Sequence, residues 1–201
     1  MRVSIGVWVD HMVAKSNTAD VSNLGYVGRK PTAKRNSDSW FTPDIYLSSV
    51  RGVLGEITLD PFSDAQANEI VKAAHYFDED ADGLSQNWNI TANCKVFMNP
   101  PYSAGMVKLC TDRFIEGWLQ KEFEEGIILV NNATETKWFQ ILLTNASSIC
   151  FTNHRISFWN ADGKVVSNNT RGQAFFYFGN HAEKFNAMFT SHGFCQELTD
   201  V

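Results

Sequence analysis

The chain of 201 residues is poor in cysteine and proline, has fewer basic than acidic residues, and contains no long apolar run. Its four cysteines are widely spaced and form no Cys-x-x-Cys pair; they are Cys94, Cys110, Cys150 and Cys195. The five histidines are also scattered, so no metal-ligand spacing is present and we expect no metal site. No apolar run approaches the roughly 20 residues of a transmembrane helix, so no membrane partner is expected.

Cysteines with no near partner in the sequence are typical of reduced thiols in an intracellular protein. The first residues also lack the charged-then-apolar layout of a secretory signal peptide. We therefore expect a cytoplasmic protein. An apolar content of 44% and this length predict one globular domain with an extension, divided into an N-terminal arm with flexible parts at 1–37 and a single domain at 38–201.

The net charge of −5 is unevenly distributed. No acidic residue falls between Val21 and Ser37, whereas the segment from Glu56 to Asp82 holds eight acids against one lysine. A basic arm beside an acidic module suits a protein that contacts nucleic-acid phosphates with one part only. The candidate contacts are Arg29, Lys30, Lys34 and Arg35 in the arm and Arg155 near the end of the sheet. A solvated arm and an arginine without a role explain the same residues equally well.

Hydrophobic periodicity predicts alternating strands and helices. Helices are expected at 43–53, 65–74, 104–119, 136–144 and 181–190, with Thr42 as the N-cap and Pro43 in the first turn of the first. Strands are expected at 1–12, 57–59, 96–98, 126–130, 148–151, 156–159 and 174–178, with a turn at 161–164. This alternation indicates an α/β fold with a doubly wound, mostly parallel sheet and an antiparallel C-terminal section.

The turn Asn99-Pro100-Pro101-Tyr102 follows the apolar run at 96–98 and precedes a helix. It therefore lies at the carboxyl end of a strand, where open α/β sheets bind their ligands. The side-chain carbonyl of Asn99 and the main-chain carbonyl of Pro100 can accept from the two N–H groups of one amino group, and two prolines aim that carbonyl. Tyr102 offers a flat face for stacking. The turn is typical of enzymes that methylate an exocyclic amino nitrogen, although Asn-Pro and Pro-Tyr are also ordinary turn dipeptides.

A second group of motifs precedes this turn in the order expected of a cofactor-binding half. Asp60-Pro61 follows a strand and places a carboxylate where it can bind the amino group of a cofactor. Asp82, in an Asp-Gly turn, can accept from an adenine amino group. Trp40, Thr42 and Pro43 can form the opposite wall. Each of these features is weak alone, and their order carries the information.

Taken together, these motifs resemble the phage-type Dam family of DNA N6-adenine methyltransferases. The resemblance covers residues 38–180, and the first 37 residues lie outside it. The matching segments are Trp40-Phe41-Thr42-Pro43, Leu59-Asp60-Pro61, Asn68, Tyr76-Phe77, Asp82-Gly83-Leu84, Trp88, Asn99-Pro100-Pro101-Tyr102, Leu129 to Phe139, Arg155-Ile156-Ser157-Phe158 and Phe178-Gly179.

The resemblance implies a Rossmann-like class I methyltransferase fold, S-adenosylmethionine as methyl donor with S-adenosylhomocysteine as product, and adenine in double-stranded DNA as acceptor. It implies a phage, prophage or restriction-modification setting. It implies that Asn99, Pro100 and Tyr102 hold the extruded adenine. It further implies that the cofactor lies among Thr42, Pro43, Asp60 and Asp82.

The sequence departs from the wider methyltransferase pattern in two places. Ser63-Asp64-Ala65-Gln66-Ala67-Asn68 replaces the glycine-rich loop, so Asn68 or a main-chain group near it is expected to take over part of the cofactor contact. Asn131-Asn132 stands where related sequences tend to carry an arginine. Two alternatives therefore stay open: a methyltransferase for another amino acceptor, such as an RNA base or a protein glutamine, and a catalytically inactive relative that only binds DNA or cofactor.

Overall fold

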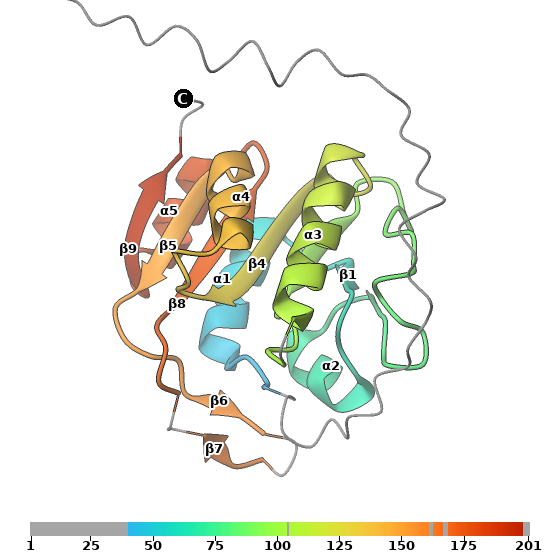
Figure 1. Ribbon diagram of the computed structural model, residues 1–201, viewed down its shortest axis with the longest axis horizontal. Coiled ribbons are helices and arrows are strands. Elements are labelled where there is room, and N and C mark those ends of the chain that lie inside the picture. Colours follow the sequence, from blue (N-terminus) through green and yellow to red (C-terminus); the bar gives the residue numbers. More distant parts are fainter. Residues whose placement is uncertain (1–39, 104, 161–162, 167–168, 199–201) are drawn as a thin grey trace, which may run out of the picture. The chain divides into compact units, whose positions relative to one another are not determined.

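A computed structural model describes residues 40–103, 105–160, 163–166 and 169–198 of the protein (Figure 1). The chain divides into two units, 1–34 and 35–201, and every described residue belongs to the second. The strand expected at 1–12 and the basic residues Arg29, Lys30, Lys34 and Arg35 lie outside the described residues. The division into an arm and a domain after residue 37 therefore stays a prediction.

Seven strands form one sheet in the order β2-β1-β3-β4-β8-β5-β9. Their bounds are Leu59–Asp60 (β1), His75–Tyr76 (β2), Lys95–Met98 (β3), Glu125–Asn131 (β4), Ser148–Thr152 (β5), Gln173–Phe178 (β8) and Gly193–Glu197 (β9). Strands β1 to β4 pair in parallel, whereas β8 pairs antiparallel with both β4 and β5, and β9 pairs antiparallel with β5. Strand β5 therefore runs with β1 to β4, and the carboxyl ends of these five strands share one edge of the sheet.

Helices cover both faces of this sheet (Figure 1). Their bounds are Asp44–Leu54 (α1), Ala65–Val71 (α2), Met106–Leu119 (α3), Lys137–Asn145 (α4) and Ala182–Phe189 (α5). Side chains of α1 and α5, such as Leu47 and Phe185, share a core with Ile127 of β4. Side chains of α3 and α4, such as Phe114, pack with Ile128 on the other face. Because neighbouring residues of β4 enter two different cores, the strand is apolar from Gly126 to Val130. The result is a mixed α/β fold consistent with a methyltransferase.

Most elements lie where the hydrophobic pattern predicts them, with small shifts at their ends. Helix α1 begins one residue later than expected, because Pro43 has extended backbone angles and is itself the N-cap. Helix α4 also begins one residue later than expected, because Thr136 is its N-cap and accepts from the Phe139 amide. Strand β6 (Phe158–Trp159) pairs antiparallel with β7 (Val165–Val166), a strand that was not predicted between the turn expected at 161–164 and the strand expected at 174–178. Strands β2 and β9 were not predicted, because neither has a run of buried apolar residues.

The described residues include no helix that combines the length and the apolar character needed to cross a bilayer.

Candidate active site

A hollow lies at the carboxyl edge of the sheet, between residues 40–42, the loop that follows β1, and the turn that follows β3. Its empty volume, which includes the open mouth, is about 630 Å³. The polar side chains that line it are Thr42, Asp60, Ser63, Asp64 and Asn99. The remaining lining residues are mostly apolar: Trp40, Phe41, Phe62, Ala67, Ile70, Val71, Phe97, Pro100 and Pro101.

The side-chain amide of Asn99 is held in one orientation. Its Nδ2 donates to the main-chain oxygen of Trp40 across 2.8 Å and lies 3.2 Å from Oγ1 of Thr42. A main-chain oxygen is only an acceptor, so it must face the NH2 end of the amide rather than its oxygen. Oδ1 therefore points away from Trp40, toward Tyr102. The turn from Asn99 to Tyr102 thus presents the side-chain oxygen of Asn99 as an acceptor in a fixed direction.

Tyr102 is tied into the turn through its hydroxyl group. The hydroxyl oxygen lies 3.1 Å from Asn99 Oδ1 and 3.1 Å from the main-chain oxygen of Leu129 in β4. A phenol has one proton, so it donates to one of these two acceptors at a time. Burial raises the pKa of Tyr102 well above its usual range, so the hydroxyl stays protonated and acts as a donor. Because an amide oxygen has two lone pairs, Asn99 Oδ1 keeps the capacity to accept a second hydrogen bond.

Asp60 places a carboxyl group at the end of β1, inside the hollow. The residue is almost fully buried, and burial raises the pKa of its carboxyl to about 7. A hydrogen bond from the Phe62 amide, across 3.2 Å, partly opposes that shift. No lysine, arginine or histidine within the described residues forms an ion pair with it. A positively charged group bound in the hollow would lower the pKa of Asp60 and favour its ionised form.

Ser63 supplies a second buried polar group in the same wall. Its hydroxyl oxygen reaches no partner at hydrogen-bond geometry in the described part of the chain, although it is near enough to Asp60 to lower the pKa of that carboxyl. An unpaired buried hydroxyl is costly unless a ligand or water completes it. An acidic group, an orphaned hydroxyl and several aromatic side chains fit a small cationic ligand that also has an apolar ring.

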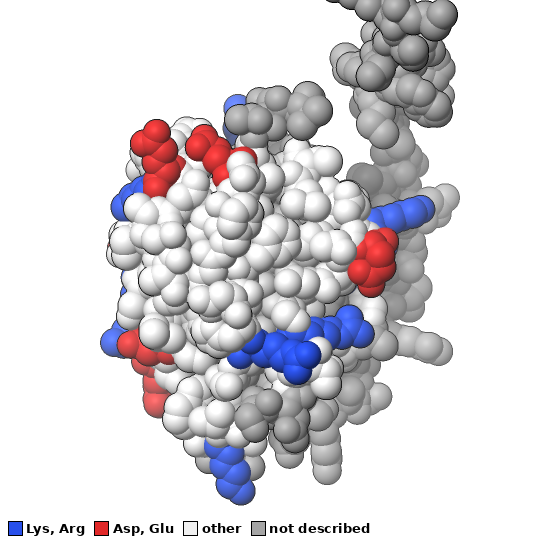
Figure 2. Space-filling model, turned by 90° about the vertical axis from the view of Figure 1, so that its left-hand side faces the viewer, with Lys and Arg blue, Asp and Glu red and all other residues white. Residues whose placement is uncertain are grey.

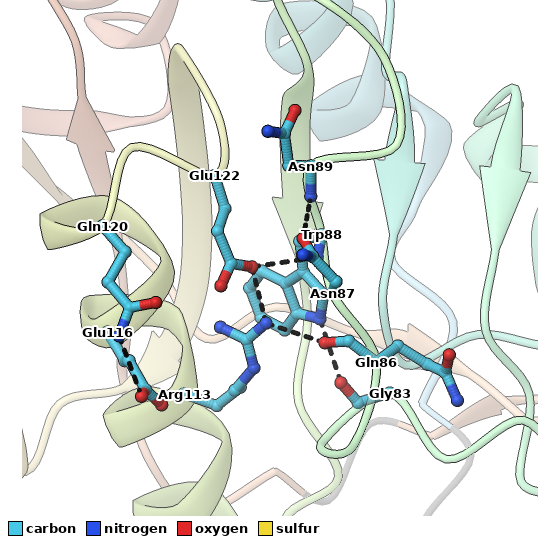
Figure 3. Close-up of polar contacts among 9 residues, drawn as sticks. All are labelled: Gly83, Gln86, Asn87, Trp88, Asn89, Arg113, Glu116, Gln120 and Glu122. Carbon is cyan, nitrogen blue, oxygen red and sulfur yellow. Dashed lines mark hydrogen bonds and ion pairs between the residues drawn. The ribbon is translucent and has the colours of Figure 1, made fainter.

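The loop 82–88 is fastened beside the hollow by an ion pair (Figure 3). Arg113 of α3 contacts Glu122 across 2.6 Å, and both side chains are nearly buried. Glu122 also accepts from the Trp88 amide at 2.9 Å, while the Arg113 guanidinium lies 4.5 Å from the centre of the Trp88 ring. The indole N–H of fully buried Trp88 donates in turn to the main-chain oxygen of Gly83. The Asp82-Gly83 turn is thereby fixed against the main chain of Pro61, which leaves no room for a β-carbon at position 83.

The hollow brings together six of the residues expected to bind cofactor or substrate: Trp40, Thr42, Asp60, Asn99, Pro100 and Pro101. Five others do not line it: Tyr102, Pro43, Pro61, Asn68 and Asp82. Both ends of the Asn68 amide bond to the main chain of Ala73, and Asp82 Oδ1 accepts from the Leu84 amide. Sequence reasoning missed the apolar lining contributed by α2. A signal for it exists, because Ala67, Ile70 and Val71 recur at the spacing of one helical face.

Exposed cations gather on the same side of the sheet as this turn. Arg155 follows β5, and Arg171 precedes β8. Both are exposed, as is Lys164 in the β6–β7 hairpin. Figure 2, which views the molecule from the left-hand side of Figure 1, shows a group of Lys and Arg side chains in its lower half, the half in which Figure 1 places the hairpin. The hairpin is joined to the hollow by two main-chain hydrogen bonds between Phe41 and Trp159.

Within the described ranges there is no group of three or more His, Cys, Asp or Glu side chains able to hold a metal ion. No individual curated protein matches the chain. The family model described as DNA N-6-adenine-methyltransferase (Dam) matches residues 29–196, which is most of the chain. The chain therefore belongs to the Dam family of DNA N-6-adenine methyltransferases.

Proposed function

We propose that this protein transfers a methyl group from S-adenosylmethionine to the exocyclic N6 of an adenine flipped out of double-stranded DNA. Membership of the Dam family supports DNA adenine methylation in general. The observation that carries the finer assignment is the fixed orientation of the Asn99 amide, whose oxygen faces Tyr102. The antiparallel β8 inserted between parallel strands, and helices on both faces, support a doubly wound class I methyltransferase fold.

Asn99 and Pro100 act on the electron pair of the adenine amino nitrogen. That pair is delocalised into the purine ring, which makes the nitrogen a poor nucleophile. Two carbonyl oxygens that accept from its two N–H groups hold the amino group in place and favour electron density on nitrogen. Pro101 keeps the turn rigid, and the face of Tyr102 stacks on the flipped base. The proton released from nitrogen after methyl transfer passes to water.

The hollow is the proposed cofactor site, and its residues fit S-adenosylmethionine, which supplies an electrophilic methyl group when bound. Asp60 would hold the positively charged amino group, and Ser63 would satisfy a polar atom of the methionine part. Trp40, Phe62 and Ile70 offer apolar surface to the adenosine part. Contacts from Pro43, Pro61, Asn68 and Asp82 remain part of this proposal. Asp82 would accept from the cofactor adenine.

DNA would lie over the carboxyl edge of the sheet, where the exposed arginines are. Arg155 and Arg171, at the ends of the neighbouring strands β5 and β8, would contact phosphates on one side of the extruded adenine. The sequence-predicted contacts Arg29, Lys30, Lys34 and Arg35 would add to them from the arm. Base extrusion costs a few kcal/mol of unstacking, which phosphate contacts offset.

Transfer of a labelled methyl group to unmethylated duplex DNA tests this proposal directly. We expect Asn99→Ala to lose methyl transfer but to keep its binding of S-adenosylhomocysteine, which calorimetry measures. Asn145→Ala is the control and should stay active, because Asn145 ends α4 near the amino ends of the parallel strands. Transfer only to RNA or to a protein glutamine would overturn the choice of acceptor. Cofactor binding without transfer to any of these acceptors would point to an inactive relative.

A further inference from the structure

Cys150 and Cys195 lie directly opposite each other on the last two strands of the sheet. They are register partners in the antiparallel pair β5–β9, and β9 forms one edge of the sheet (Figure 1). Directly opposed residues in an antiparallel pair point to the same face. Both side chains accordingly pack in the core that α1 and α5 cover, Cys150 fully buried and Cys195 partly exposed.

The hydrogen bonds at the two ends of this pair identify what kind of position the cysteines occupy. Leu198 donates its amide to Ser147, and Asn153 donates its amide to His192. Both contacts join residues that lie directly opposite each other in the register of β5 and β9. Odd-numbered positions from 147 to 153 therefore belong to hydrogen-bonded pairs. Hydrogen-bonded and non-hydrogen-bonded pairs alternate along an antiparallel ladder. Cys150, at an even-numbered position, therefore faces Cys195 in a non-hydrogen-bonded pair.

This position suits a disulfide. In non-hydrogen-bonded pairs the Cα atoms are about 4.5 Å apart and the side chains approach most closely. Disulfides span Cα separations of roughly 4.4–6.8 Å, so the two strands need no large movement to accept one. Cys94 and Cys110 differ, because both are buried in the core on the other face of the sheet.

We propose that Cys150 and Cys195 are an oxidation site, at which a two-electron oxidant of the peroxide or disulfide class forms a cross-strand disulfide. With hydrogen peroxide, the thiolate sulfur of Cys195 attacks one peroxide oxygen, the O–O bond breaks, and water leaves after protonation. The sulfur of Cys150 then attacks the resulting Cys195 sulfenic acid. The S–S bond forms, and the Cys150 proton leaves with the displaced hydroxide as a second water molecule. Two thiols are oxidised and one peroxide is reduced.

The environment favours this order of events. Cys195 is the thiol that solvent reaches. The interaction with the opposed Cys150 thiol lowers the pKa of Cys195, and the same interaction raises the pKa of Cys150. A thiolate, rather than a thiol, is the attacking species. Burial raises the pKa of Cys94 to about 11, so that thiol should stay unreactive.

The test treats the native full-length protein with hydrogen peroxide or oxidised glutathione and then counts thiols in denaturant. We expect the number to fall from the four of the reduced chain to two. The intact mass should fall by two hydrogen atoms, and a non-reducing digest should contain the Cys150 and Cys195 peptides joined. Dithiothreitol should restore both thiols.

Control variants separate this reaction from general oxidation. The double variant Cys94→Ser, Cys110→Ser should still lose both remaining thiols, whereas Cys195→Ser should form no cross-link. Retention of four thiols in the treated protein would overturn the proposal. So would a glutathione adduct on Cys195 that never resolves, or a cross-link that includes Cys94 or Cys110. The site lies away from the Asn99 turn, so this result is independent of the proposed function.

Discussion

The hydroxyl of Tyr102 lies 3.1 Å from the side-chain oxygen of Asn99, so the aromatic residue of the turn also holds its amide. Tyr102 reaches β4 as well, through the main-chain oxygen of Leu129. The ring is thereby anchored to the strand next to β3. The residue expected to act only as a stacking surface has a second task, which is to fix the turn to the sheet.

Removing that hydroxyl separates the two tasks. We expect Tyr102→Phe to lower kcat about fivefold, because one net hydrogen bond contributes roughly 1 kcal/mol. Tyr102→Ala, which also removes the ring, should lose far more activity. Single-turnover methyl transfer with saturating cofactor measures both. Equal losses in the two variants would show that the hydroxyl alone matters.

Thr42 supports Asn99 from the other side, and its role can be tested with a nearly isosteric pair of variants. Thr42→Val leaves one N–H of the Asn99 amide without an acceptor, so kcat should fall about tenfold. Thr42→Ser keeps the oxygen and should retain most activity. Because Thr42 also lines the hollow, calorimetry with S-adenosylhomocysteine measures separately how much cofactor affinity each variant loses. An equal loss in both would mean that the threonine methyl group, rather than its hydroxyl, is required.

Cofactor binding should depend on the ionisation of Asp60. Its pKa is about 7, and a bound cation favours the carboxylate, so affinity should rise as the pH rises through 7. Between about pH 6 and pH 8 the dissociation constant should fall about tenfold. Isothermal titration with S-adenosylhomocysteine, which keeps the amino group, measures this. Asp60→Asn should bind weakly at both pH values, and a wild-type affinity independent of pH would exclude the role.

The same carboxyl should reduce the stability of the protein above neutral pH. A raised pKa means that the folded state holds the proton more tightly than the unfolded chain. Stability is therefore lost as the pH rises from about 4 to about 7. Urea unfolding at about pH 8 should show Asp60→Asn to be more stable than the wild type by up to a few kcal/mol. At about pH 4, where both states bind the proton, the difference should largely disappear.

The exposed arginines at the carboxyl edge should contribute to DNA affinity through phosphate contacts. Arg155→Gln and Arg171→Gln should each reduce the slope of log affinity against log salt concentration by about one. Lys121→Gln, just before β4 at the opposite edge, is the matched control and should leave the slope unchanged. Fluorescence anisotropy with a labelled duplex measures all three. An unchanged slope in both arginine variants would place the DNA elsewhere.

Much of the fold could be predicted, because its signals are local. The continuous apolar run of β4 and the Thr136 cap each depend on neighbouring residues. The strand, turn and helix around Asn99 were also predictable, with β3 ending at Met98 and α3 beginning at Met106. Strand β9 was not, because it is a partly exposed edge strand that exists only by pairing with β5.

Most residues of the site could be predicted from the sequence, but the hydrogen bonds that orient them could not. The partners that fix Asn99 and Tyr102 include the main-chain oxygens of Trp40 and Leu129. Every residue has such an oxygen, so no side chain in the sequence marks them. The burial that raises the pKa of Asp60 likewise depends on the packing of the loop after β1 rather than on any neighbouring motif.

The place of β8 has a consequence for synthesis of the protein on the ribosome. Among the strands that the structure describes, β5 pairs with β8 and β9 and with none made before it. Until residues 173–178 have emerged, β4 and β5 are two unjoined edges with apolar faces. Such edges invite pairing with other chains. We expect chains that stop before β8 to be rapidly degraded or to aggregate.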